Sequence, residues 1–104
     1  MEEEIKIEDE FTLIRFQNDS PEPFYAQHEI GTGLIQFHFG IKGNAKFLFN
    51  QGNYALELKE EKSLLLYNPQ KELPLHLELA PNSWVISVIV SIKKFHALFS
   101  AEAN

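Results

Sequence analysis

Two polar side chains lie two residues apart in an otherwise apolar stretch, LIQFHFGI, at residues 34–41. Residues i and i+2 of a β-strand share a face, so Gln36 and His38 are placed to reach one metal ion or one ligand. Imidazole suits transition metals, but a carboxamide is a poor ligand, and residues 39–43 contain no carboxylate. We therefore predict neither a metal site nor another cofactor.

The remaining roles for this pair are a hydrogen-bonded interior and a contact with a polar ligand. A buried imidazole or amide without a partner costs on the order of 1–3 kcal/mol, so both residues need partners. Mutual pairing inside the chain is the interpretation we favour for His38, with ligand contact as the alternative.

Three further residues complete the candidate ligand-binding set. Tyr67 and Trp84 have rings that could stack on a sugar or small aromatic effector, although such residues more often fill a core. His76 alternates with Leu75 and Leu77, which favours a position on the solvent side of a half-buried strand. The full set of candidate ligand-binding residues is Gln36, His38, Tyr67, His76 and Trp84.

Motifs for covalent or phosphate chemistry are absent from the sequence. No serine has the context of a nucleophile elbow. Gly31-Thr32-Gly33 precedes a strand-like stretch, whereas a phosphate-binding glycine loop opens a helix. We predict that the chain is not an enzyme.

The elements that position these residues have the two-residue period of β-strands. About eight apolar stretches, at intervals near ten residues, are separated by turns such as Lys42-Gly43-Asn44 and Asn50-Gln51-Gly52-Asn53. This spacing predicts an antiparallel jelly roll or barrel over residues 11–92. We expect Phe11, Leu13 and Ile14 to face inward and Arg15 outward. Residues 63–67 are expected to form a central strand, because that strand is apolar on both faces. We also expect a core containing Phe37, Phe39, Phe47 and Phe49.

The period changes after Ser91, a plausible N-cap. Ile92, Phe95 and Phe99 follow at the i, i+3 and i+7 positions of a helix. The helix is short and apolar on one side, so we expect it to pack on the barrel or on a partner. Our candidates for a homodimer interface are the Trp84 strand and the helix residues Ile92, Phe95, Leu98 and Phe99.

Charge is concentrated at the start of the chain. The net charge is −6 over 104 residues. Residues 1–10 hold six acids and one lysine, which leaves only −1 for the rest. We treat residues 1–10 as an acidic N-terminal segment with a weak strand signal. A nearly neutral remainder offers no basic face to nucleic acid. An acidic start, no cysteine and no membrane-length apolar run predict a cytoplasmic protein without membrane contact.

An ordered series of motifs resembles a known family. FGIKGNAKFLFNQGNYALEL, then EEKSLLLYNP, then a proline-bearing loop before another strand, is similar to the N-terminal cupin-like sensing domain of AraC-type transcription regulators. The family pattern L-x-x-G-D-x-x-L-x-x-P is matched loosely by residues 58–69, with Glu61-Lys62 at the usual Gly-Asp bend. The resemblance covers about residues 24–99.

This resemblance implies an all-β, cupin-like jelly roll, or double-stranded β-helix, with a short C-terminal helix. It implies a domain that binds a small effector or dimerises. DNA would be bound only through a helix-turn-helix domain absent from this chain. Residues 93–104 would then begin a truncated helical linker to that domain.

Two alternatives remain. One is a small metal-dependent cupin enzyme using His38 and His76, although metal-binding cupins carry a histidine where Gln36 stands and His76 is off their usual spacing. The other is a structural dimerisation domain without a ligand.

Overall fold

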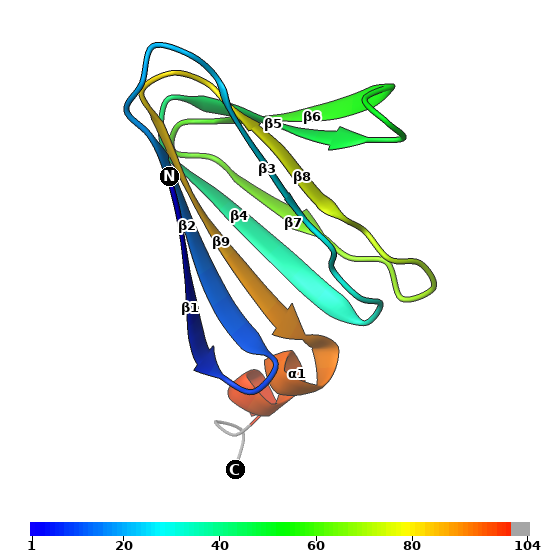
Figure 1. Ribbon diagram of the computed structural model, residues 1–104. Coiled ribbons are helices and arrows are strands. Elements are labelled where there is room, and N and C mark those ends of the chain that lie inside the picture. Colours follow the sequence, from blue (N-terminus) through cyan, green and yellow to red (C-terminus); the bar gives the residue numbers. More distant parts are fainter. Residues whose placement is uncertain (101–104) are drawn as a thin grey trace.

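The computed structural model describes the backbone of residues 1–100 and the side chains of residues 1–98. In this part of the chain nine strands precede one helix (Figure 1). In order they are β1 (Glu2–Glu8), β2 (Phe11–Asn18), β3 (Phe24–His28), β4 (Leu34–Lys42), β5 (Asn44–Phe49), β6 (Tyr54–Lys59), β7 (Ser63–Leu66), β8 (Leu75–Leu79), β9 (Ser83–Ser91) and α1 (Ile92–Ser100).

The strands form two antiparallel sheets that face each other. The first has the order β1-β2-β9-β4-β7 and the second the order β3-β8-β5-β6. Strands far apart in sequence are therefore neighbours: Phe11 in β2 is paired with Val90 in β9. The predicted all-β jelly roll with a short C-terminal helix is confirmed.

The core lies between the sheets and is filled from both. Leu75, Leu77 and Leu79 of β8 have no exposed surface, and Phe47 of β5 is 1% exposed. In both strands every second residue faces the other sheet, as the period-2 pattern predicts. The core cluster consists of Ile14, Phe16, Ala26, Ile30, Ala45, Phe47, Leu58, Leu75, Leu77, Leu79, Val85 and Ile89.

Two strands of the first sheet differ in part from our prediction. In β2, Ile14 is buried and Arg15 exposed as expected, but Phe11 and Leu13 lie on the outer side. In β4, Gln36 and His38 face inward, as the favoured interpretation of His38 requires, but Phe37, expected in the core, lies outside. Phe39, also expected in the core, is 39% exposed.

A close approach of two chain segments explains the orientation of β4. Lys59 ends β6, and a side chain at Gly40 would collide with its backbone oxygen. The face of β4 that contains Gly40, and with it Gln36 and His38, therefore points inward, where only a glycine fits beside Lys59. Alternation fixes which residues share a face, but a one-residue change of register exchanges the two faces.

The two edges of the first sheet also differ from expectation. β7, predicted as central, is an edge strand, and its Leu65 is 57% exposed. At the other edge, residues 1–10 carry only a weak strand signal, yet Glu2–Glu8 pairs with β2 as β1. Charged residues are common on edge strands because they discourage pairing with other chains. His28 Nε2 of β3 lies 2.6 Å from Glu2 Oε2 and joins the two sheets at this edge.

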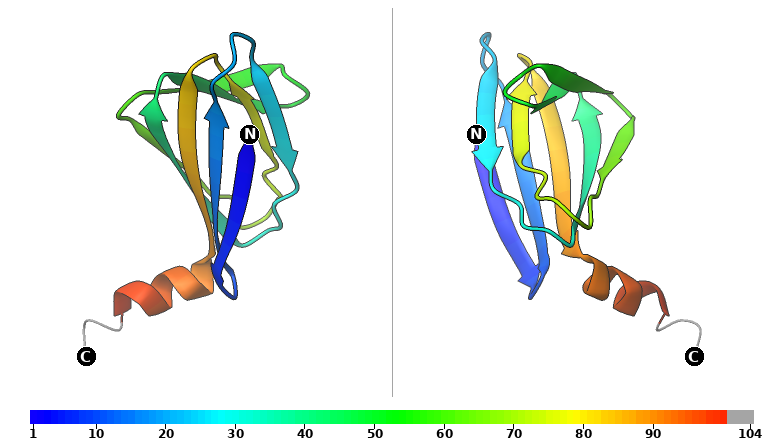
Figure 2. Two further views of the ribbon diagram at one scale, coloured as in Figure 1. Left: turned by 60° about the vertical axis from the view of Figure 1, so that its left-hand side comes forward. Right: turned by 90° about the vertical axis from the view of Figure 1, so that its right-hand side faces the viewer.

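Helix α1 begins directly after β9 and projects from the end of the sandwich (Figure 2). The predicted N-cap is present: Lys94 N donates to Ser91 Oγ at 2.9 Å. Lys94 also forms an ion pair with Glu8 of β1, and this hydrogen bond raises the pKa of Lys94. Within the described residues, no helix has the length and apolar character needed to cross a membrane.

Candidate functional site: an inner polar network and an outer apolar face

Gln36, His38 and Ser87 form a hydrogen-bonded network on the inner side of the first sheet. β4 and β9 are neighbours, and their register pairs His38 with Ser87. His38 Nδ1 lies 2.5 Å from Ser87 Oγ, and His38 Nε2 lies 2.9 Å from Gln36 Oε1. All three side chains are fully buried, with no exposed surface.

The hydrogen bonds of Gln36 determine which nitrogen of His38 carries the proton. Gln36 Nε2 donates to Leu73 O at 2.6 Å, so Gln36 Oε1 is the acceptor for His38. His38 Nε2 therefore donates, and Nδ1 accepts from the Ser87 hydroxyl. Burial lowers the pKa of His38 from 6.5 to about 3, so the ring is neutral at physiological pH. The ring also packs against Phe47, with centroids 4.2 Å apart.

The other buried polar side chains are paired in the same way. Asn18 Nδ2 donates to three backbone oxygens, including Glu22 O at 2.7 Å. Ser83 Oγ accepts from Asn44 N and donates to Pro81 O, and Ser91 caps α1. Among the described residues, one buried side-chain atom lacks a hydrogen bond, Asn44 Oδ1 at the start of β5.

The inner polar network does not fit a metal ion. Both ring nitrogens of His38 are engaged, and its neighbour is an amide whose oxygen accepts the His38 proton. Nowhere in the described part of the chain do three or more His, Cys, Asp or Glu residues gather in a way that could hold an ion. Beyond the single imidazole of His38, the network offers no carboxylate and no second imidazole, the donors that Mn, Fe, Ni and Zn prefer.

The structure brings together only two of the five candidate ligand-binding residues. Gln36 and His38 are inside, as described. His76 is paired with Gln27 of β3 and lies on the outer side of the second sheet, the position favoured by its alternation with leucines. Trp84 lies on the outer side of the first sheet, where its Nε1 donates to Asp19 Oδ1 at 3.3 Å. Tyr67 follows β7 and is 36% exposed.

The outer side of the first sheet carries an extended apolar surface. The strand register aligns one outward-facing row across all five strands. Two half-exposed residues of the neighbouring row, Ile86 and Phe39, continue it. We call this surface the outer apolar face; it consists of Ile5, Phe11, Leu13, Phe37, Phe39, Leu65, Ile86 and Val88.

A groove of about 270 Å³ lies where helix α1 meets this face. The rings of Phe37 and Phe95 stack there with centroids 6.0 Å apart. The groove is lined entirely by apolar residues, namely Phe11, Phe37, Phe39, Val88, Val90, Phe95 and Leu98. Two of the four predicted interface residues of the helix, Phe95 and Leu98, thus line the groove. Ile92 is half-buried, and the side chain of Phe99 lies outside the described residues.

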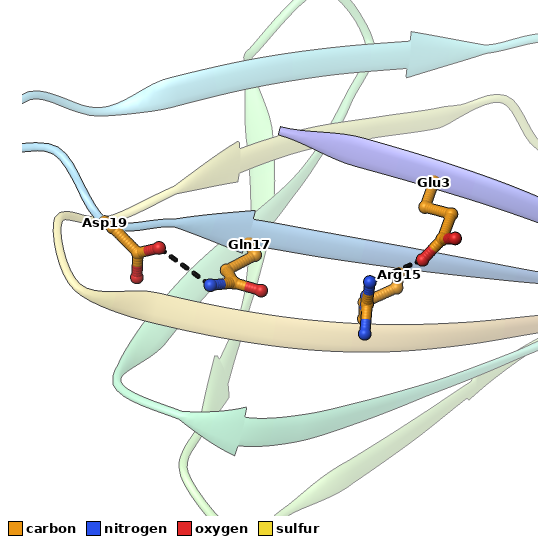
Figure 3. A network of polar contacts seen from close by, with 4 residues as sticks. All are labelled: Glu3, Arg15, Gln17 and Asp19. Carbon is orange, nitrogen blue, oxygen red and sulfur yellow. Dashed lines mark hydrogen bonds and ion pairs between the residues drawn. The ribbon is translucent and has the colours of Figure 1, made fainter.

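Polar contacts border the outer apolar face along β1 and β2. Arg15 Nη2 of β2 donates to Glu3 Oε1 of β1, and Gln17 Nε2 donates to Asp19 Oδ2 at 2.7 Å (Figure 3). An apolar centre with a polar rim is the usual composition of a protein interface.

The Trp84 strand at the centre of this face was a candidate dimer interface, but the rest of the face was not predicted from the sequence, because its phenylalanines were expected in the core. The available signal was the uniformly apolar row Ile35, Phe37, Phe39 and Ile41. Such a row suits a buried face and a protein interface equally well, so alternation alone does not distinguish the two.

Solved structures with a similar fold are found by comparing structures. No family model matches the sequence, and no curated protein does. An RmlC-like cupin protein from Desulfovibrio desulfuricans is similar, with a TM-score of 0.64 and 11% identity over 86% of this chain and 80% of that one.

Two further solved structures show the same likeness. The Cupin_2 domain of an XRE family transcriptional regulator from Enterobacter cloacae has a TM-score of 0.59 and 12% identity, over 86% of this chain and 94% of that one. KdgF from Halomonas has a TM-score of 0.58 and 12% identity, over 86% of this chain and 76% of that one. At such identities the likeness establishes fold and not activity. This chain has the jelly-roll fold of cupin domains.

Proposed function

We propose that this chain is the non-catalytic dimerisation domain of a transcription regulator, whose DNA binding is supplied by a separate helix-turn-helix domain. The motif series similar to AraC-type sensing domains supports the regulatory role. So does the likeness to a domain of an XRE family regulator, in which the same fold is part of a transcription factor. The AraC-type assignment itself rests on the motif series.

The observation that carries the proposal is the closed inner polar network. Gln36, His38 and Ser87 bond to one another and to the backbone, so a polar ligand entering between the sheets would have to break these bonds. Displacing them leaves buried polar groups unpaired, at about 1–3 kcal/mol each. The available binding surface is instead on the outside, over the outer apolar face and α1. This favours association with a protein over capture of a sugar inside the barrel.

A fusion experiment tests the proposed function. The chain is joined to a DNA-binding domain that represses a reporter only as a dimer. We expect repression to be restored relative to the DNA-binding domain alone. Lack of repression at equal protein levels would contradict a dimerisation function.

The alternative of a metal-dependent cupin enzyme is tested on the same purified chain. We expect elemental analysis to find no stoichiometric Mn, Fe, Ni or Zn. We also expect these ions to leave the melting temperature unchanged, because a ligand that binds only the native state raises it. Stoichiometric metal that is lost in His38→Ala would overturn the non-catalytic proposal.

A further inference from the structure

We propose that a second copy of this chain covers the outer apolar face, so that the first sheets of the two copies stack about a two-fold axis running along β9. The inference rests on the proposed dimerisation function and specifies its interface. Four observations carry it: the extent of the face, its symmetry about β9, its charges and the groove beside α1.

The extent of the face suits a protein partner. Its fully apolar row runs from one edge of the sheet to the other: Ile5, Leu13, Val88, Phe37 and Leu65. Five strands about 4.8 Å apart and rows about 7 Å apart give a footprint of roughly 500 Å² for the three rows of the face. Contiguous exposed apolar patches of this size mark interaction sites. The side chains of α1 add to it, which approaches the ~800 Å² that each partner buries in a standard interface.

The face is symmetric in the way that a two-fold interface requires. Val88 lies on β9, the middle strand of the five. Leu13 and Phe37 flank it one strand away, and Ile5 and Leu65 follow at the two edges. An axis along β9 places β2 of one copy over β4 of the other, so that Leu13 meets Phe37 and Ile5 meets Leu65. Val88 then faces its own counterpart, as residues near the axis of an isologous interface do.

The charges of the edge strands select the direction of the axis. On the side of the outer apolar face, β1 carries two acids, Glu3 and Glu8, which are paired with Arg15 and Lys94, whereas β7 contains no charged residue. An axis running across the strands would stack β1 on its own copy and bring like charges together, which is unfavourable. An axis along β9 places β1 over the uncharged β7.

The groove supplies contacts at one end of the interface. With the axis along β9, both helices lie at the same end of the dimer. Phe95 and Leu98 line the groove on their own sheet, where Phe95 stacks on Phe37, and β2 of the other copy, with its Phe11, would lie over β4 beside this groove. Leu98 is 46% exposed, so a facing apolar residue would remove a large side chain from water.

A small apolar ligand explains less of this surface. It would occupy the groove beside Phe95 but would leave the edge residues in water, since Ile5 is 43% and Leu65 is 57% exposed. Only a partner as wide as the sheet covers both edges together.

Charge complementation at Val88 tests the interface. We expect sedimentation to show that Val88→Asp and Val88→Lys are each monomeric at about 100 µM, because each places two like charges at the axis and weakens the dimer more than tenfold. An equimolar mixture of the two variants should form a heterodimer, since opposite charges then meet. Circular dichroism and thermal melting establish that each variant is folded.

Leu48→Asp is the matched control. Leu48 is half-buried on the outer side of β5, an inner strand of the second sheet, and its substitution should leave the dimer intact. If the Val88 variants do not fold, Leu65→Asp takes their place, because this edge residue contributes little to the core and its substitution should also give a monomer.

The outcomes separate the interface from the function. A dimer that persists in folded Val88→Asp and in Leu65→Asp places the interface elsewhere and leaves the dimerisation function standing. Monomeric Val88 variants that fail to combine rule out an axis along β9. A wild-type monomer at about 100 µM, together with no repression by the fusion protein, overturns both proposals.

Discussion

At the scale of single residues, His38 shows how a candidate ligand is turned into a structural group. Its side chain lies between Gln36 and Ser87, and each ring nitrogen has a partner. A histidine held this way is neutral, because protonation would put a charge in a fully buried site and would replace the acceptor at Nδ1 by a donor. The position therefore contributes stability in the neutral form.

This predicts a loss of stability in mild acid. The pKa of His38 is about 3 in the folded chain and 6.5 unfolded, so between these values the unfolded state binds more protons and is favoured as pH falls. The contribution is complete above pH 6.5 and declines below it. From pH 8 to pH 5 we expect the free energy of unfolding to drop by about 2 kcal/mol from this residue.

Urea denaturation at the two pH values measures the effect as a difference between variants. Between pH 8 and pH 5, the free energy of unfolding should fall by about 2 kcal/mol less in His38→Gln than in the wild type. In His76→Gln, whose ring lies on the outer side of the second sheet, the fall should equal that of the wild type. Equal pH dependence in wild type and His38→Gln would refute the assignment.

At the scale of elements, β4 is oriented by its neighbours. Gly40 is hydrogen-bonded to the connection between β6 and β7: its N donates to Lys62 O and its O accepts from Glu61 N. This connection crosses so closely that there is no room for a side chain. The strand must present its small and polar residues inward, and its phenylalanines are left on the outer side.

The glycines of the chain provide a matched test. We expect Gly40→Ala to lower the free energy of unfolding by roughly 1–3 kcal/mol, because the new methyl group meets backbone that cannot move aside. Gly31→Ala, where no atom lies within 4 Å of the added carbon, should change it by less than about 0.5 kcal/mol. Chemical denaturation measures the free energy of unfolding of both variants. Equal values would show that the approach of Lys59 to Gly40 leaves room for a side chain.

In the whole molecule, the inner and outer sides of the sheets have different roles. The second sheet and the inner side of the first bury the core and its polar network. The outer side of the first sheet, continued by α1, remains apolar and half-exposed. The exposed part of this surface does not stabilise one copy by itself, but it stabilises an assembly when association removes this apolar area from water.

This division predicts that stability depends on protein concentration. A dimer that forms only from folded chains raises the melting temperature as concentration increases. We expect this increase for the wild type across a hundredfold range and none for Val88→Asp. Calorimetry or thermal fluorescence measures how the melting temperature of each protein depends on its concentration. A wild-type melting temperature that is independent of concentration would contradict the dimer.

Local sequence rules were enough to predict most of the strands, the turns between them, the helix and its serine cap. These rules are alternation along strands, glycine and asparagine at turns, and a hydroxyl ahead of a helical repeat. They also correctly paired Gln36 with His38 on one face, because residues two apart in a strand share a side. The β1 strand was the weak point, since its charged residues suit an exposed edge and resemble a flexible segment.

Long-range contacts were needed to settle which face of each strand is inside and which strands are edges. β2 and β4 each have two acceptable faces, and the choice depends on segments far along the chain, such as Lys59 over Gly40 and Ser87 beside His38. The same long-range pairing put Trp84 and His76 on the outer sides of different sheets. It also aligned apolar residues of five strands into one row, because the register between strands is set by pairing partners and not by local sequence.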